Sequence, residues 1–216
     1  MVYAFLFDLD GVLVDSEDYS RKASDRVLAE VGITLTEAEK KNVFGRRTLE
    51  NYERYIKSRE LDLDANKLLD QKNRLFAELI SGKLKLLPGV TELFALLDET
   101  GIKKALVSSS PLVRVNATLE EVGLLMEFDV IVSGDCCSRG KPDPAPFLFA
   151  SEKIGAEPGE CVVVEDAQVG VEAALAAGMR VIAVDSPSTH GQDLSQADIH
   201  LNSLKQIDRK FIEDLA

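Results

Sequence analysis

Short apolar runs recur along the chain and predict buried strands at residues 2–7, 104–107, 130–132, 161–164 and 181–184. Before each of the last four runs, apolar residues recur at helical spacing, and each helical pattern ends at a glycine, the usual helix stop. Strands that alternate with helices in this way favour an α/β fold. We therefore predict a Rossmann-like, mostly parallel sheet with helices on both faces.

One segment breaks the alternation of strands and helices. Between residues 16 and 86 no run predicts a strand, and the apolar spacing instead predicts helices at residues 17–31, 36–42, 48–58 and 64–80. The sequence thus predicts an α/β core formed by residues 1–15 and 87–216, with an inserted all-helical cap formed by residues 16–86. A closing helix is expected at the end of the chain.

The first apolar run ends in two aspartates. Asp8 and Asp10 follow it directly, and Gly11 comes next. Open α/β folds bind their ligands at the carboxyl edge of the sheet. Two carboxylates at that edge can divide the work between an ionised nucleophile and a general acid and base. The alternative is that the aspartates only cap the turn after the strand.

Two further motifs could hold a phosphate. Ser108 and Ser109 follow the second run, and a hydroxyl at a helix start can bind phosphate together with the backbone amides. The alternative is a serine N-cap with Pro111 at the first helical position. Lys141 lies in a proline-rich loop, where a rigidly held ammonium could neutralise phosphate charge. Its alternative is a solvated lysine.

A second pair of acids, Glu165 and Asp166, ends the fourth apolar run. Such hard oxygen ligands suit Mg²⁺, although acids are also common at helix N-termini. All four motifs lie between a strand and a helix, and such junctions meet at one edge of a doubly wound sheet. Together they predict one cluster that contains a nucleophile, an acid/base, phosphate anchors and a metal site.

In their order along the chain, these motifs resemble the four motifs of the haloacid dehalogenase-like hydrolase superfamily: Asp8-Leu9-Asp10-Gly11, Ser108, Lys141 and Glu165-Asp166. The helical insertion is similar to the cap of the branch that contains phosphoglycolate phosphatase and β-phosphoglucomutase. The resemblance covers nearly the full length. It implies that Asp8 attacks phosphorus and forms an aspartyl-phosphate, and that Asp10 protonates the leaving oxygen and then activates water.

The same resemblance implies a magnesium cofactor. Mg²⁺ would be bound by the side chain of Asp8, the backbone carbonyl of Asp10 and Asp166, with support from Glu165 directly or through water. The residues that would hold the transferring phosphoryl group are Ser108 and Lys141. Within the superfamily, an acid at position 10 favours phosphate chemistry over dehalogenation, because a halide leaving group needs no proton.

We expect residues of the cap to determine the substrate specificity. We predict substrate contacts from Gly45, Arg46 and Arg47 in a loop between two cap helices, from Lys72 on the last large cap helix, and from Ser109 of the core. The cationic side chains among these residues could bind a second anionic group or sugar hydroxyls. The alternative for each is a solvated charged face. The expected substrate is a small phosphorylated metabolite, a sugar or polyol phosphate.

The final acceptor of the phosphoryl group decides between two reactions. Compared with β-phosphoglucomutase, the chain has Ser20 instead of a histidine, Thr48 instead of an arginine and Pro111 instead of a lysine. These differences favour a phosphatase, with a sugar-phosphate mutase as the alternative. A third hypothesis is a non-enzymatic phospho-acceptor similar to a receiver domain, but such a module is shorter and lacks a cap.

The formal net charge of −12 argues against nucleic acid or an anionic membrane as the main partner, since both need a basic surface. Cys136, Cys137 and Cys161 have no metal-ligand spacing and suggest reduced thiols. No apolar stretch is long enough to suggest a signal peptide or a membrane span. We therefore expect a cytoplasmic protein that is a monomer or a weak homodimer.

Overall fold

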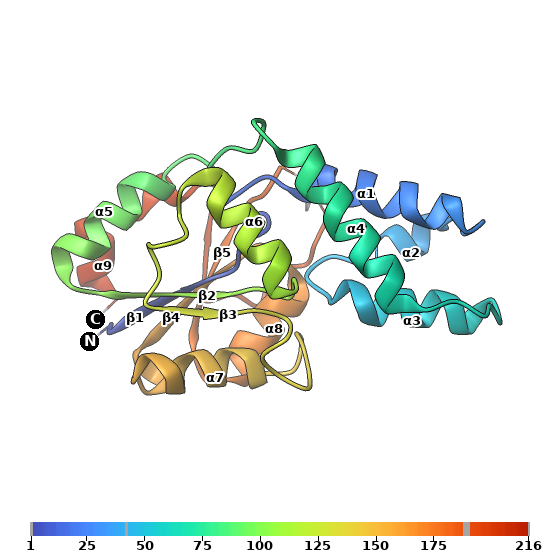
Figure 1. Ribbon diagram of the computed structural model, residues 1–216. Helices are drawn as coiled ribbons and strands as arrows, with labels where there is room; N and C mark the ends of the chain where they lie inside the picture. The colour runs from blue at the N-terminus through green and yellow to red at the C-terminus, as the bar shows by residue number, and fades with distance from the viewer. Residues whose placement is uncertain (1, 42, 188–190, 216) are drawn as a thin grey trace.

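The computed structural model describes residues 2–41, 43–187 and 191–215. It contains a six-stranded parallel sheet in the order β3-β2-β1-β4-β5-β6 (Figure 1). The strands are β1 (Ala4–Phe7), β2 (Lys103–Val107), β3 (Val130–Val132), β4 (Cys161–Glu165), β5 (Arg180–Val184) and β6 (Ile199–Leu201). The predicted α/β class with a parallel sheet is confirmed.

The sequence pattern located five of these strands closely but missed β6. This strand has 3 residues, and its central residue, His200, is exposed and lies 2.8 Å from Asp185 Oδ1 through its Nε2. Among the described residues it pairs with β5 alone, at the edge of the sheet. The equally short β3 is a continuous apolar run, whereas the exposed His200 interrupts β6, so no apolar run marks this strand.

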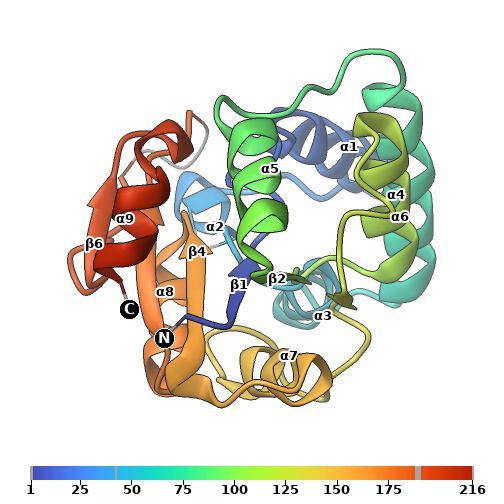
Figure 2. The same cartoon turned by 90° about the vertical axis from the view of Figure 1, so that its left-hand side faces the viewer.

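Alternate side chains of β1 face two different hydrophobic layers. Phe5 and Phe7 belong to a cluster with helices α5 (Val90–Thr100), α6 (Leu112–Val122) and α9 (Arg209–Asp214). Ala4 and Leu6 belong to a cluster with α7 (Ala145–Ile154) and α8 (Gln168–Ala176). Figures 1 and 2 show these helices on opposite faces of the sheet. This period of two explains the continuous apolar sequence of the strand.

Short 3₁₀ turns complete the core. They are η1 (Pro158–Glu160), before β4, and η2 (Leu204–Gln206), before α9. The closing helix predicted for the end of the chain is therefore a 3₁₀ turn followed by a short α-helix. Among the described residues, no helix is both long enough and apolar enough to span a bilayer.

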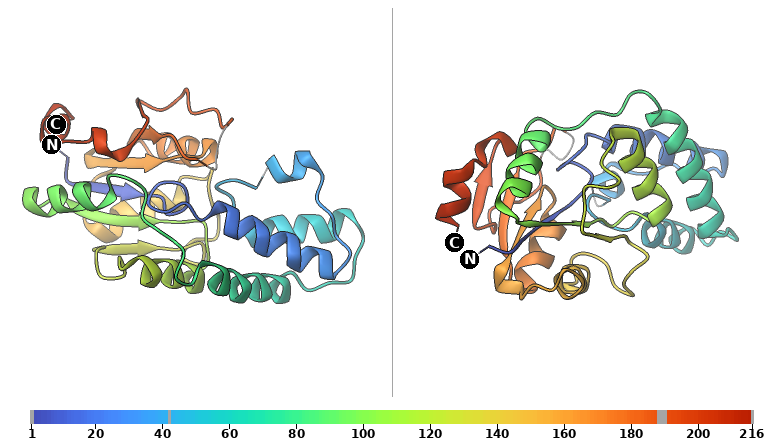
Figure 3. Two further views of the ribbon diagram at one scale, coloured as in Figure 1. Left: turned by 90° about the horizontal axis from the view of Figure 1, so that it is seen from above. Right: turned by 60° about the vertical axis from the view of Figure 1, so that its left-hand side comes forward.

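Four helices follow β1 and precede α5: α1 (Glu17–Glu30), α2 (Glu37–Lys41), α3 (Thr48–Ser58) and α4 (Ala65–Ile80). They match the predicted helices closely, although residue 42, the predicted end of the second, lies outside the described residues. Figure 3 shows this helical group to one side of the sheet. It has its own hydrophobic cluster, formed by Val27, Leu28, Ile33, Tyr52, Tyr55, Ala65 and Leu68. We interpret the group as the cap.

The cap is joined to the core through α4. Phe76 and Ile80 of this helix are buried in the core cluster that contains Phe5 and Phe7, and α4 packs against α6. The two segments that connect the cap to the core, one before α1 and one after α4, lie side by side, because Val14 and Leu86 form an isolated antiparallel bridge. The cap therefore packs directly against the edge of the core at which the candidate site lies.

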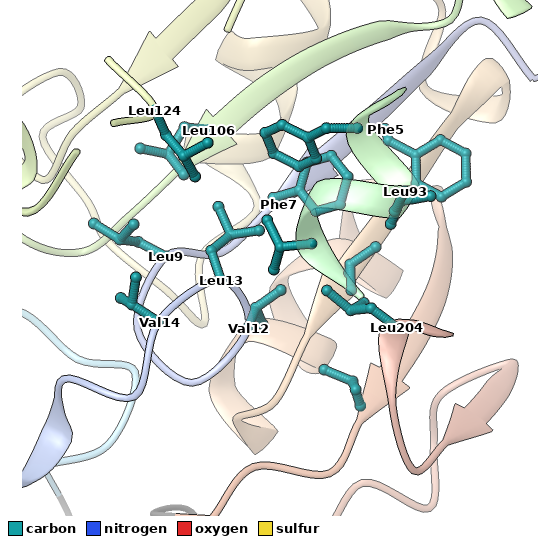
Figure 4. Close-up of a cluster of buried hydrophobic side chains, with 14 of the residues drawn as sticks. Phe5, Phe7, Leu9, Val12, Leu13, Val14, Leu93, Leu106, Leu124 and Leu204 are labelled. Carbon is teal, nitrogen blue, oxygen red and sulfur yellow. The ribbon is translucent and has the colours of Figure 1, made fainter. Parts of the chain in front are cut away.

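The segment after β1 is buried rather than a free loop. Leu9, Val12 and Leu13 are at most 1 % exposed and pack with the core cluster of β1 (Figure 4). The turn is closed by a 2.8 Å hydrogen bond from the Gly11 amide to the Val14 carbonyl. Because the apolar neighbours are anchored, the polar side chains at positions 8 and 10 are held at the carboxyl end of the strand.

Candidate active site

The register of the sheet brings three predicted motifs to one level. Phe7 pairs with Leu106 of β2 and with Val164 of β4. The next residue on β1, Asp8, is held there by a 3.0 Å hydrogen bond from its amide to the Val164 carbonyl. As a result, the side chains that follow the central strands meet at one edge, as in other open α/β sheets.

The Lys141 ammonium contacts residues at the carboxyl ends of three strands, β1, β2 and β4. Nζ lies 2.5 Å from Asp8 Oδ1, 2.6 Å from Glu165 Oε1 and 2.9 Å from the Val107 carbonyl. Burial disfavours the charged lysine, but Asp8 and Glu165 outweigh that effect and raise the pKa of Lys141 above its usual range. The solvated-lysine alternative is therefore wrong, because all three ammonium donors are used inside the protein.

An acidic cluster surrounds this lysine. Carboxylate oxygens of Asp8, Glu165 and Asp166 lie within 4.8 Å of one another, and all three residues are buried. Burial, together with the charges of Glu165 and Asp10, raises the pKa of Asp8 to about 7, although Lys141 opposes the shift. Buried hard oxygen ligands of this kind fit a divalent cation such as Mg²⁺. A cation would favour the ionised form of Asp8.

Both carboxylate oxygens of Glu165 accept hydrogen bonds. Oε1 accepts from Lys141, and Oε2 accepts from the amides of Asp166 at 2.9 Å and Ala167 at 3.1 Å. This arrangement suits a carboxylate that orients its neighbours and supports a metal through water.

Two glycines allow the acids to pack this closely. A Cβ at Gly11 would lie 1.8 Å from Asp166 Oδ2, and Gly11 has a φ of +85°. A Cβ at Gly170, in the first turn of α8, would lie 1.8 Å from Glu165 Oε1. The backbone therefore approaches both carboxylates more closely than any other residue would permit.

Asp10 is held by three side chains that the sequence analysis missed. Its Oδ1 accepts from Ser16 Oγ and, at 2.8 Å, from Arg114 Nη2, while Oδ2 accepts from Ser110 Oγ at 3.2 Å. A signal for Arg114 does exist in the sequence. It lies on the face of α6 that also contains the buried residues Val115, Thr118 and Leu119. A charged residue on such a face needs a partner in the protein interior.

The two serines of the second motif have different surroundings. Ser108 is buried, and its Oγ accepts from the Ser110 amide at 3.1 Å. Ser109 Oγ instead donates to the Gly45 carbonyl of the cap at 2.7 Å. The N-cap of α6 is Pro111, with no capping side chain, so the serine N-cap alternative is wrong.

A cavity between cap and core is lined by Asp8, Asp10 and Ser108, and also by the cap residues Gly45, Arg46 and Lys72. Lys72 is buried, and its Nζ donates to Thr48 Oγ1 at 2.9 Å. Glu17 of α1 lines the same cavity, and burial raises the pKa of its carboxyl to about 7. The sequence analysis also missed Glu17. Acidic residues are common in the first turn of a helix, so the sequence does not distinguish Glu17 from an ordinary surface glutamate.

The predicted substrate contact of Arg47 needs correction. Arg47 does not line the cavity. Its guanidinium donates to the carbonyls of Cys137 at 2.8 Å and Ser138 at 3.2 Å, and approaches Glu50 at 3.6 Å. These contacts turn the side chain toward a core loop, whereas its neighbour Arg46 stays at the cavity.

The chain matches the model of the haloacid dehalogenase-like hydrolase family over residues 5–184. It is 34 % identical to hexitol phosphatase A of Escherichia coli, over 94 % of this chain and 92 % of that protein. Among solved structures, CbbY of Rhodobacter sphaeroides in complex with xylulose-(1,5)bisphosphate has a TM-score of 0.87 and 26 % identity, covering 95 % of this chain and 96 % of that one.

A β-phosphoglucomutase of Clostridium difficile has a TM-score of 0.85 and 26 % identity, covering 100 % of this chain and 97 % of that one. These similarities confirm the predicted family branch and the predicted class of enzyme, a hydrolase of phosphoric monoesters. They leave the receiver-like hypothesis without support.

Proposed function

Because the chain belongs to the haloacid dehalogenase-like hydrolase family, we propose that it is a Mg²⁺-dependent phosphatase of small sugar or polyol phosphates. The observation that carries the proposal is the buried contact of Lys141 with both Asp8 and Glu165, next to Asp166. The contact supports a site in which a nucleophile, a fixed cation and metal ligands meet at the edge of the sheet.

In the first half-reaction, a carboxylate oxygen of Asp8 attacks phosphorus and forms an acyl-phosphate bond while the ester bond of the substrate breaks. Asp10, in its protonated form, gives its proton to the leaving alkoxide. The Ser108 hydroxyl holds an oxygen of the transferring phosphoryl group, and the Lys141 ammonium beside Asp8 supplies positive charge next to it. Phosphoryl transfer depends mainly on such positioning and charge neutralisation.

In the second half-reaction, Asp10 accepts a proton from water, whose oxygen attacks phosphorus. The acyl-phosphate bond breaks, which releases phosphate and restores the Asp8 carboxylate. Mg²⁺, when bound by Asp8, Asp166 and the Asp10 carbonyl, would supply positive charge that offsets the repulsion between the carboxylate and the phosphate. Glu165 would keep Lys141 and the neighbouring backbone in place.

The substrate class is supported by the chemistry of the cavity. Arg46, Lys72 and Glu17 offer charged donors and acceptors to hydroxyl groups, and Ser20 adds a hydroxyl. The similarity to hexitol phosphatase A favours a polyol or sugar phosphate. The similarity to β-phosphoglucomutase supports a mutase as the second candidate, although Ser20, Thr48 and Pro111 differ from the mutase pattern.

The test is phosphate release from a panel of sugar and polyol phosphates, with and without MgCl₂. We expect metal-dependent release that Asp8→Asn abolishes and that Asp214→Asn, which removes an exposed carboxylate, does not. Full metal-dependent release by Asp8→Asn would overturn the proposal. Interconversion of glucose 1- and 6-phosphates, driven by a bisphosphate, would instead establish the mutase.

A further inference from the structure

Two buried cations face the candidate active site from opposite sides of the cap–core boundary. Arg114 comes from core helix α6 and is 6 % exposed, whereas Lys72 comes from cap helix α4 and is 2 % exposed. Both line the cavity that contains Asp8 and Asp10. Burying two charges of the same sign near each other is unfavourable, so their surroundings should reveal a use for them.

Arg114 is held firmly but is only partly satisfied. Its Nη2 donates to Asp10 Oδ1 at 2.8 Å, and its guanidinium carbon lies 4.3 Å from the centre of the Phe76 ring on α4. Its Nε is buried and has no hydrogen-bond partner among the described residues. A guanidinium with five donors in a rigid plane is well suited to an acidic oxygen ligand, and here part of that capacity is unused.

Lys72 donates to a neutral hydroxyl rather than to a carboxylate. Its Nζ donates to Thr48 Oγ1 at 2.9 Å, and in the described part of the chain it forms no salt bridge. Burial and then the charge of Arg114 lower the pKa of Lys72 to about 7, although Glu17 and Asp10 oppose this. An anion bound between the two cations would remove their repulsion and restore the charged form of the lysine.

The carboxylates already present do not fill this role. Asp10 engages Arg114 and is needed for proton transfer in the proposed reaction. Glu17 lines the cavity, but among the described residues it forms no salt bridge with either cation, and burial raises its pKa to about 7. The cations therefore retain capacity for a ligand from solution.

We propose that Arg114 and Lys72 form a second anion subsite, so that the preferred substrates carry a carboxylate or a second phosphate in addition to the transferred phosphoryl group. The inference rests on the proposed phosphatase function and narrows its substrate class. The transferred group binds at Lys141 and Ser108, and the second anionic group of the same small molecule binds at Arg114 and Lys72.

The test compares sorbitol 6-phosphate, whose remainder is neutral, with gluconate 6-phosphate and glucose 1,6-bisphosphate. We expect kcat/KM to be at least about tenfold higher for the better of the two doubly anionic substrates. The two anionic substrates distinguish a carboxylate from a second phosphate. Equal kcat/KM values for all three would overturn the subsite and leave the phosphatase function intact.

Variants assign the preference to the two cations. Lys72→Met and Arg114→Gln should each lower the ratio of anionic to neutral kcat/KM by about tenfold, whereas Arg114→Lys should retain much of it. The ratio is the right measure because Arg114 also contacts Asp10, so its loss slows all substrates alike. The control is Lys205→Met, which removes a lysine outside the cavity and should leave the ratio unchanged. An unchanged ratio in both Lys72→Met and Arg114→Gln contradicts the inference.

Binding provides a readout that does not depend on turnover. In the Asp8→Asn protein, calorimetry with Mg²⁺ should show that gluconate 6-phosphate or glucose 1,6-bisphosphate binds at least about tenfold more tightly than sorbitol 6-phosphate. Addition of Lys72→Met should remove that difference. If no phosphate is released from any substrate but this binding difference is found, the phosphatase proposal fails while the anion subsite stands.

Discussion

The guanidinium of Arg47, at the start of cap helix α3, donates a 2.8 Å hydrogen bond to the carbonyl of Cys137 in the core. The same side chain packs on Gly140, where a Cβ would lie 2.7 Å from Arg47 Nε. Gly140 directly precedes Lys141, the residue that joins Asp8 to Glu165. The cap is thus connected through one side chain to the loop that positions the central cation of the site.

Removal of this connection should loosen that loop. In Arg47→Ala, we expect faster amide hydrogen exchange over residues 136–140 and a free energy of unfolding lower by about 1–2 kcal/mol, because two hydrogen bonds to backbone carbonyls are lost. The matched control is Arg139→Ala in the same loop, whose exposed side chain forms an ion pair with Asp143. Identical exchange in the two variants would show that Arg47 does not hold the loop.

Lys141 should be important for stability as well as for activity. Lys141→Met leaves the buried carboxylates of Asp8 and Glu165 without a cation, which should cost about 3–5 kcal/mol of unfolding free energy. Added Mg²⁺ should stabilise the variant through the same acids, although without restoring phosphate release. Chemical denaturation with and without MgCl₂ measures both effects. Lys205→Met serves as the control, and equal stability of the two variants contradicts the prediction.

Gly170 should tolerate no side chain. In Gly170→Ala the new Cβ would lie 1.8 Å from Glu165 Oε1. The carboxylate must therefore move away from Lys141 and from the backbone amides that donate hydrogen bonds to it. We expect a loss of stability of about 1–3 kcal/mol and weaker Mg²⁺ binding by calorimetry. Gly159→Ala is the matched control, because a Cβ there would meet nothing within 4 Å. Normal Mg²⁺ affinity in Gly170→Ala would show that Glu165 does not support the metal.

Lys72 should make stability depend on pH. Its pKa is about 7 in the folded protein, against an ordinary value of 10.5, so the unfolded chain binds more protons between these values. The contribution of Lys72 to the free energy of unfolding should therefore increase from pH 7 to pH 10, by at most about 1.4 kcal/mol per pH unit. In Lys72→Met this contribution is absent.

Urea denaturation at several pH values between 7 and 10 measures the difference. When the curves of the wild type and Lys72→Met are subtracted, the groups that do not interact with Lys72 cancel, and the difference contains Lys72 together with its effect on Glu17. The difference should change with pH for Lys72→Met and stay constant for Lys205→Met. Parallel curves for the wild type and Lys72→Met would mean that Lys72 titrates normally in the folded state.

Most elements of the fold were predictable from local patterns. The segment 48–58 has a strong helical spacing of apolar residues, and α3 has these same bounds. The segment 130–132 likewise matches β3. The edge strand β6 was not predictable, because its pairing with β5 depends on where the chain returns to the sheet. A closing helix was predicted at the end of the chain and corresponds to α9, but the 3₁₀ turn η2 that precedes it was not predicted, because no apolar period marks it.

The chemistry that the chain offers at one sheet edge follows from local sequence. Asp8, Lys141 and Glu165 lie at or between recognisable elements, and parallel strands bring such positions together whatever the details of packing. The use of the long cationic side chains depends instead on tertiary contacts. Arg47 and Arg114 can each reach several partners, and their choice depends on contacts between the cap and the core, which no local sequence pattern records.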